Sequence, residues 1–304
     1  MASEPIDSFI LRLKEFIYTS PFEGEVVNEF MSLIAEIHQD KEEGKLSKSN
    51  LGLLQKQANL AFPVHTMHGH AIARPRVYSG DFELIDKIYT QYCSHSEHWA
   101  AWDRHFHSLP TFIAVRNRKA YFQKLLEKSL SGFSTSSSSF KVLNLLSGSC
   151  RPIKEFLQVH NPESMAFDCV EVDRHAIEYA SGLLGHLGSS VRFVNQNVFR
   201  FKPETTYDLI WAGGLFNYLD DKLFMHMLKH VASWMSPGAK LAIGIVSDTN
   251  PNIDYLEVLF DWRVYHRSTD QVISLVKEAG LGALSQKLFS EPLNAIQFLE
   301  LVKQ

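Results

Sequence analysis

The segment from Lys141 to Asp173 constrains the fold of this chain more than any other part. It opens with a short apolar run, Lys141–Leu146, and the small-residue turn Ser147–Cys150 follows at once. Residues 152–159 then have helical spacing with proline at an early helical position. A second apolar run over 166–173 ends in carboxylates. Runs this short and apolar are typical of buried parallel strands, so the order predicts a strand–turn–helix–strand unit.

The same alternation continues to the end of the chain. Further strands are predicted at 191–197, 207–212, 239–246, 284–289 and 295–302, with helices at 221–235 and 270–279 and a turn at Ser236–Gly238. Short connections between alternating helices and strands predict a doubly wound, mostly parallel sheet. The last two strands have too little chain between them for a crossover, so they should form an antiparallel hairpin at the sheet edge. The predicted fold is a Rossmann-like α/β sheet of seven strands.

The turn after the first strand suits a ligand that contains a nucleoside. Gly148 lets a ligand approach the backbone at a helix N-terminus, and the carboxylate of Glu171 follows at about the spacing that suits ribose hydroxyls. The G-x-G-x-x-G pattern is absent, because Leu146 and Cys150 stand where further glycines are expected. A pyrophosphate needs more backbone amides than this turn offers. S-adenosylmethionine has no phosphate, although a purely structural turn explains the loop alone equally well.

The order of elements over residues 140–304 resembles class I S-adenosylmethionine-dependent methyltransferases. The resemblance implies S-adenosyl-L-methionine as cofactor. It places the methionine part near the first loop and the end of the fourth strand, the ribose near the second strand, and the adenine near the third. The implied cofactor-binding residues are Ser147, Gly148, Ser149, Glu171, Val172, Asp173, Asn197, Val198 and Gly213, with Asp173 also capping the next helix.

Three motifs carry a narrower resemblance, and they span both halves of the chain. Arg74–Glu83, Gly214–Leu219 and Asp261–Arg267 are similar to a bacterial group of 3-hydroxypalmitic acid methyl ester biosynthesis proteins. The resemblance implies a lipid-like acid as the methyl acceptor and a methyl ester as the product.

Four residues are predicted to be catalytic or to contact the acceptor. Asn217 and Tyr218 follow the fourth strand, at the edge where open α/β sheets bind ligands. Arg267 carries a guanidinium that suits a carboxylate. Tyr78 precedes Asp81, for which two interpretations stay open: Asp81 caps the following helix, or the segment folds over the cofactor.

The acceptor decides whether a base is needed. A carboxylate is already ionised at neutral pH because its pKa is about 4. An alcohol, amine or thiol would need a general base, for which a histidine is the candidate. Seven of the 14 histidines lie between His65 and His107. His65, His68 and His70 could supply metal ligands, but without a cysteine or paired acidic partner we predict no metal site.

Composition excludes several classes of protein. A net charge of −4 gives no electrostatic footprint for nucleic acid, and the Arg116, Arg118 and Lys119 cluster is interpreted as a solvated helix face. No apolar run reaches the roughly 18 residues of a membrane span, and the N-terminus lacks the pattern of a signal peptide. Three widely spaced cysteines are typical of a reducing compartment, so a cytoplasmic location is expected.

Domain boundaries follow from one low-complexity run. We predict a helical substrate or lid domain at 1–130, a Ser-rich linker at 131–139, and the methyltransferase domain at 140–304. Scaffolding or dimerisation is an alternative role for the helices. The expected helices span 6–18, 24–40, 50–60, 82–92, 95–106 and 111–130.

The sequence therefore predicts an S-adenosylmethionine-dependent methyltransferase that acts on a small or lipid-like acid. Two alternatives stay open: an O- or N-methyltransferase of another small metabolite, and a cofactor-binding module without catalysis. The expected partner is a small molecule, with neither nucleic acid nor a membrane span. The sequence does not indicate the oligomeric state, and a homodimer is one option.

Overall fold

The structure is a computed structural model that describes residues 4–19, 21–131, 139–160 and 165–304. The chain divides into two compact units: Met1–Ile113 with Pro251–Arg263, and Ala114–Asn250 with Val264–Gln304. These boundaries differ from the expected ones, because residues 251–263 join the helical unit and residues from 114 on join the sheet unit. The predicted linker at 131–139 lies mostly outside the described residues. The lid or substrate role of the helical unit stays a prediction.

The first unit is helical. Its helices are α1 (Glu4–Tyr18), α2 (Glu25–Glu42), α3 (Lys48–Ala61), α4 (Met67–Ala73), α5 (Phe82–Thr90), α6 (Glu97–Ser108), α11 (Ile253–Phe260) and the first residues of α7 (Pro110–Ser131). Aromatic side chains fill the centre: Phe22 stacks on Trp102 with ring centroids 3.5 Å apart, and Phe30 meets both rings edge-on. Burial of large aromatic rings is the main source of stability in such a core.

The two short helices of this unit were not predicted. Helix α4 has only seven residues and contains Gly69, a residue that disfavours helix. Gly69 is required there, because a Cβ atom would lie 1.9 Å from the carbonyl oxygen of Pro63. Helix α11 has only eight residues, five of them buried, and so short an apolar run cannot be distinguished from a buried strand in a sequence.

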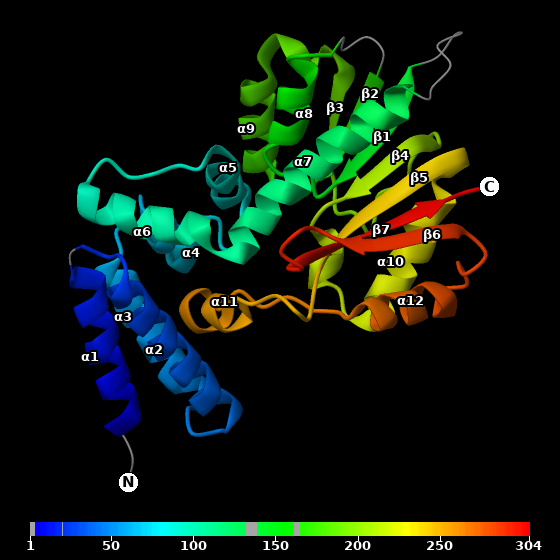
Figure 1. The fold of residues 1–304 in the computed structure, drawn as a ribbon. Helices are drawn as coiled ribbons and strands as arrows, with labels where there is room; N and C mark the ends of the chain where they lie inside the picture. Colours follow the sequence, from blue (N-terminus) through cyan, green and yellow to red (C-terminus); the bar gives the residue numbers. More distant parts are fainter. Residues whose placement is uncertain (1–3, 20, 132–138, 161–164) are drawn as a thin grey trace. The chain divides into compact units, whose positions relative to one another are not determined.

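The second unit contains one seven-stranded sheet (Figure 1). Its strands are β1 (Phe140–Leu145), β2 (Met165–Glu171), β3 (Val191–Asn195), β4 (Tyr207–Ala212), β5 (Met235–Val246), β6 (Ser285–Ser290) and β7 (Ile296–Val302). The strand order is β3-β2-β1-β4-β5-β7-β6, and the first five strands are parallel. Strand β7 runs antiparallel to both β5 and β6. The predicted mostly parallel sheet with an antiparallel final hairpin is confirmed.

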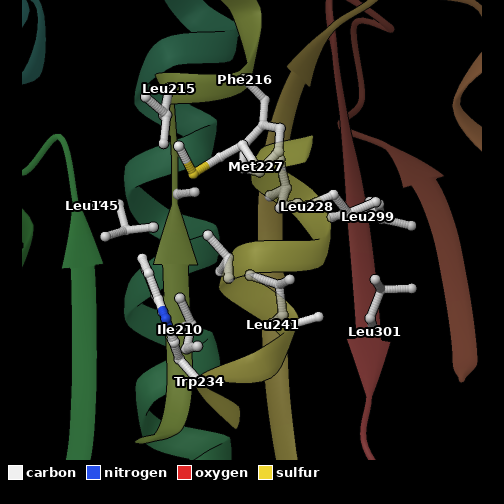
Figure 2. Packing of buried hydrophobic residues seen from close by; sticks show 14 of the residues in the cluster. Leu145, Ile210, Leu215, Phe216, Met227, Leu228, Trp234, Leu241, Leu299 and Leu301 are labelled. Carbon is white, nitrogen blue, oxygen red and sulfur yellow. The ribbon is translucent and has the colours of Figure 1, made fainter. Parts of the chain in front are cut away.

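Helices cover both faces of this sheet. On one face lie α7, α8 (Arg151–Leu157) and α9 (Arg174–Leu184), and the ring of Phe122 in α7 stacks on Trp211 of β4. On the other face, α10 (Asp221–Ser233) and α12 (Thr269–Glu278) bury a continuous apolar cluster. Figure 2 shows Met227 of α10 close to Leu215 and Phe216, and Ile210 of β4 close to Trp234.

Element bounds match the expected ones closely except at β5. The turn predicted at Ser236–Gly238 lies inside this strand, which begins at Met235 and changes register against β4 between Tyr207 and Leu209. No helix in the described part of the chain has the length and apolar character needed to cross a lipid bilayer. The five parallel strands bring their carboxyl ends to one edge, where ligands bind in folds of this type.

Candidate cofactor site

The loop after β1 has an unusual backbone. Leu146, Gly148 and Cys150 all have positive φ angles, of 55°, 54° and 53°. A non-glycine residue in this left-handed region costs roughly 1–2 kcal/mol. The Leu146 amide donates to the Val170 carbonyl at 3.0 Å and the Cys150 amide to the Ser147 carbonyl at 3.2 Å, which helps to hold the strained conformation. The loop thus has the backbone that glycines would favour, although the sequence has only one glycine.

Glu171, the last residue of β2, is the centre of the site. Its side chain is buried, and its Oε2 accepts a hydrogen bond from the amide of Gly148 at 2.9 Å. Its Oε1 accepts from the amides of Val172 and Asp173 at 2.8 and 3.1 Å. One carboxylate therefore ties the β1 loop to the turn after β2.

The protonation of Glu171 reflects two opposing effects. Burial raises its pKa above the usual value, and the three backbone amides partly offset this by favouring the charged form. An ionised carboxylate offers about four acceptor positions, of which three are used here. Glu171 can therefore still accept one hydrogen bond from a ligand hydroxyl.

Ser147 and Cys150 affect which ligand could bind at the β1 loop. The Ser147 hydroxyl is buried and has no hydrogen-bond partner within the described residues. Buried polar atoms without a partner are rare, so an external group at this position would satisfy it. The Cys150 thiol is buried against Cys169, with the sulfur atoms 3.6 Å apart. Cys150 therefore packs into the core and does not obstruct the loop, whereas Leu146 is 38% exposed.

Asp173 and Asn197 organise the neighbouring turns. Asp173 caps α9, and its Oδ1 accepts from the amide of His175 at 2.9 Å, as predicted. Asn197 uses its Oδ1 to accept from the amide of Phe199 at 2.9 Å, which leaves its NH2 group as a donor. The side chain of Val198 packs in the core, and no hydrogen bond of its backbone amide occurs within the described ranges.

The turn after β4 accepts a hydrogen bond from a cation of α7, Arg118. The carbonyl of Gly213 accepts from Arg118 Nη1 at 3.0 Å, and a Cβ on Gly213 would lie 3.0 Å from Trp211. Lys119, next to Arg118, pairs with Glu155 of α8 at 2.8 Å. The interpretation of these cations as a solvated helix face is wrong, since both are partly buried against the sheet unit. Only the position of α7 over the sheet, which requires the fold, could have shown this.

Asn217 is buried and is bonded to the backbone of two other segments. It lies in the short 3-10 helix η3 (Leu215–Tyr218) and is buried. Its Oδ1 accepts from the amide of Val246 at 2.9 Å, and its carbonyl accepts from the amide of Tyr265 at 2.8 Å. Asn217 therefore links the ends of β4 and β5, whereas its neighbour Tyr218 is 43% exposed.

Arg267 has partners that differ from the predicted substrate carboxylate. The guanidinium is buried, and it donates from Nε and Nη2 to Asp221 Oδ1 at 3.0 and 2.9 Å. It also donates to the carbonyls of Phe216 at 3.3 Å and Leu219 at 2.5 Å. The ring of Phe224 lies 4.7 Å from its carbon centre. These contacts hold the 215–219 turn and occupy the guanidinium, so Arg267 stabilises the fold and is not proposed to bind the substrate.

The remaining predicted residues lie in the helical unit. Asp81 caps α5 by accepting from the amide of Leu84 at 2.8 Å, which confirms the capping interpretation. Tyr78 is 41% exposed, and Trp262 packs in the interior against Gly80. A cofactor contact for Tyr78 or Asp81 stays a prediction.

The three histidines that could have held a metal have different surroundings. His65 is exposed, the ring of His68 meets the Tyr255 hydroxyl at 2.6 Å, and His70 meets Asp81. In the part of the chain that the structure describes, the group with metal-like spacing is His38, Glu42 and Glu257. The ammonium of Lys41 already bridges both of these carboxylates.

The structure thus brings most predicted site residues to one edge of one unit. The loops after β1 to β4 carry Ser147, Gly148, Ser149, Glu171, Val172, Asp173, Asn197, Val198, Gly213, Asn217 and Tyr218.

Comparison with known proteins shows the fold. No protein-family model and no curated protein matches the sequence. Among solved structures, a "possible exported protein" from Bordetella parapertussis aligns over 98% of this chain and 95% of its own, with a TM-score of 0.63 and 14% identity. A magnesium protoporphyrin IX methyltransferase from Synechocystis PCC 6803, crystallised with bound SAH, aligns over 72% of this chain and 93% of its own. Its TM-score is 0.51 at 12% identity. The sheet unit has the Rossmann-like fold of such methyltransferases.

Proposed function

We propose that this chain is an S-adenosylmethionine-dependent methyltransferase whose acceptor is a small or lipid-like acid, giving a methyl ester. The observation that carries the proposal is the geometry around Glu171. A buried carboxylate is held by three backbone amides at the carboxyl edge of the sheet, directly beside a loop with three left-handed residues. A fixed acceptor of this kind suits a ribose hydroxyl.

The residues at this edge fit an adenosyl group. Glu171 would accept from one ribose hydroxyl at its unused acceptor position. The unpartnered Ser147 hydroxyl and the backbone at Gly148 would contact the methionine part. The NH2 group of Asn197 and the backbone amide of Val198 would donate to the adenine. No phosphate has to be accommodated.

The chemistry requires alignment more than proton transfer. The bound sulfonium supplies an electrophilic methyl group. Asn217 fixes the turn after β4, so that the exposed ring of Tyr218 can border the acceptor and exclude water. An ionised carboxylate acceptor needs no base. Resemblance to the 3-hydroxypalmitic acid methyl ester group supports a fatty acid as the acceptor.

The two alternative functions differ in what they require of this edge. Another O- or N-acceptor would need a base close to Tyr218. A binding module without catalysis would need only the Glu171 site. The free thiols of Cys93, Cys150 and Cys169 support a reducing compartment such as the cytoplasm.

Calorimetric titration with S-adenosylmethionine and with its demethylated product tests the cofactor. The change Glu171→Gln keeps the shape but removes the charge, and hydrogen bonds to charged groups contribute about 1.5–3 kcal/mol. We expect roughly a 10- to 100-fold loss of affinity. The matched control is Glu178→Gln, which neutralises an exposed carboxylate on α9 and should leave affinity unchanged.

Transfer of labelled methyl groups to saturated acids of graded chain length tests the acceptor. Base-labile label in the lipid fraction supports a methyl ester. Tight cofactor binding without transfer to any acid, alcohol or amine supports the binding module, and no cofactor binding at all rejects the proposal.

A further inference from the structure

Three side chains of the helical unit form a continuous hydrogen-bonded chain that the proposed methyl transfer does not use. His70 Nε2 lies 3.1 Å from both carboxylate oxygens of Asp81. The other ring nitrogen, Nδ1, lies 3.0 Å from the Nζ atom of Lys87. His70 comes from α4, whereas Asp81 caps α5 and Lys87 lies in the last turn of α5. Two helices and their connection thus assemble an Asp–His–Lys arrangement.

The chemistry of the three groups fixes the direction of the hydrogen bonds. An ammonium group only donates, so Nδ1 of His70 must be the acceptor from Lys87. The proton of the neutral imidazole then sits on Nε2 and is donated to Asp81. His70 and Asp81 are both buried, at 2% and 1% exposure, so water does not compete for these bonds. The imidazole is therefore oriented to take a proton from Lys87.

Lys87 itself is only half-buried, and its amine lies 5.2 Å from the centre of the Tyr92 ring. Burial lowers its pKa, although Glu83, Asp81 and Asp103 favour the charged form. A lysine near the end of a surface helix can extend into water, yet this one turns to the ring of His70. A nucleophile beside a base that a third group orients is the general signature of an activated nucleophile.

We propose that Asp81, His70 and Lys87 form a proton relay that makes the Lys87 amine a nucleophile toward aldehydes and ketones. His70 takes a proton from the ammonium and becomes an imidazolium between Asp81 and the free amine. The amine nitrogen forms a bond to the carbonyl carbon, and proton transfer within the adduct gives a carbinolamine. His70 then returns its proton to the carbinolamine hydroxyl, the C–O bond breaks, and water leaves. The product is a protonated imine, so proton, charge and atom counts balance.

Reductive trapping on the full-length protein tests this relay. Propanal with cyanoborohydride alkylates amines through their imines, and peptide mass mapping gives a rate for each lysine. Lys56, an exposed lysine on α3 of the same unit, is the internal reference. Each unit by which a pKa falls gives about tenfold more free amine at neutral pH. We expect Lys87 to be trapped several-fold faster than Lys56, and an equal or slower rate in the wild-type protein would overturn the proposal.

The variant Asp81→Asn separates a relay from simple electrostatics. Asparagine caps a helix as well as aspartate does, so α5 keeps its N-cap. Loss of a nearby negative charge alone would free more of the Lys87 amine and speed its alkylation. If His70 acts as the base, loss of the Asp81 carboxylate that orients it would slow the alkylation of Lys87. A slower rate in Asp81→Asn supports the relay, and a faster rate overturns it.

The variant His70→Asn provides the second test, because it removes the base while leaving Asp81 in place. We expect trapping of Lys87 to fall to the rate of Lys56. Unchanged trapping in a folded His70→Asn protein would contradict the assigned role. None of these measurements depends on methyl transfer, so their failure and that of the proposed function are separate.

Discussion

The two units hold their buried carboxylates in different ways. Among the described residues, the groups that donate to the Glu171 carboxylate in the sheet unit are backbone amides. Asp81 of the helical unit accepts from one backbone amide and from the ring of His70. Backbone amides do not titrate, whereas an imidazole does. The sheet unit therefore presents a fixed acceptor suited to binding, and the helical unit contains a group that can move a proton.

The two units also differ in the surroundings of their buried nitrogen-bearing side chains. In the helical unit, burial lowers the pKa of His105 to about 4, and burial also lowers the pKa of His68 well below its usual value. In the sheet unit, the buried guanidinium of Arg267 donates hydrogen bonds to two carbonyls and to Asp221. This difference predicts which substitutions and which pH changes affect each unit.

The largest effect is expected in the sheet unit, from Arg267→Met. The change leaves the buried Leu219 carbonyl without a donor, and the Phe216 carbonyl keeps only the amide of Leu219 at 3.4 Å. A lost donor to a buried carbonyl costs about 1–3 kcal/mol, so the free energy of unfolding should fall by about 3 kcal/mol. Its control is Asp221→Asn, where the carboxylate is 65% exposed and the loss should stay below about 1 kcal/mol. Urea denaturation measures both. Equal losses would mean that the ion pair, and not the carbonyl bonds, holds the turn.

The helical unit should respond next most strongly, to Asp81→Ala. The change removes the α5 cap and leaves the ring N–H of His70 without an acceptor, at a combined cost of about 2–3 kcal/mol. Asp81→Asn keeps an acceptor oxygen and should lose only about 1 kcal/mol. The same denaturation assay compares them. If the two variants were equally stable, Asp81 would hold neither α5 nor His70.

Acid should weaken the helical unit before the sheet unit. His105 has a folded pKa below its unfolded value of about 6.5, so the unfolded chain binds the proton more readily. Its contribution is complete above about pH 6.5 and is lost as the pH falls toward about 4, with about 2 kcal/mol lost by about pH 5. His68 acts in the same direction.

The sheet unit has a different pH window. The pKa of Asp168 is lowered despite its burial, because Arg192 and Tyr207 bond to it, so this contribution is lost only in stronger acid. The raised pKa of Glu171 has the opposite sign and favours the fold as the pH falls. Hydrogen exchange of α6 and β4 between about pH 7 and pH 5 distinguishes the units. Earlier loss of protection in β4 would contradict the comparison.

The smallest effect concerns the β1 loop. Leu146→Gly relieves a left-handed residue but adds glycine entropy in the unfolded chain, so a gain of at most about 1 kcal/mol is expected. Cys150→Gly relieves similar strain but leaves a cavity beside Cys169, and it should destabilise the protein. Thermal unfolding shows whether each variant is more or less stable than the wild-type protein. Stabilisation by both changes would show that strain outweighs packing at both positions.

Sequence patterns predicted the fold better than the site. Buried parallel strands appear in a sequence as continuous apolar runs, so β1, β2 and β4 were placed within a residue or two. Glu171 and Asp173 were proposed as site residues because a carboxylate after the second strand has a positional meaning, and their contact with a cofactor stays a prediction. Helix α11 was missed because it is buried on most sides, and its place in the helical unit depends on contacts between distant segments.

The misjudged residues share one physical reason. Arg267 and Asp221 are 46 positions apart, and Arg118 reaches Gly213 across 95 positions, so nothing local in the sequence reveals these bonds. The left-handed conformations of Leu146 and Cys150 oppose their intrinsic preferences, and tertiary contacts impose them. Local propensity predicts elements, whereas the partners of a charged side chain depend on the completed fold.

The central claim is that the sheet edge around Glu171 binds the adenosyl cofactor. A crystal structure of the protein with S-adenosylhomocysteine tests it most directly. The account predicts a ribose hydroxyl within hydrogen-bond distance of Glu171, with the amino acid part beside Ser147 and Gly148. Adenosine bound away from this edge, or an edge that stays closed at saturating ligand, would contradict the account.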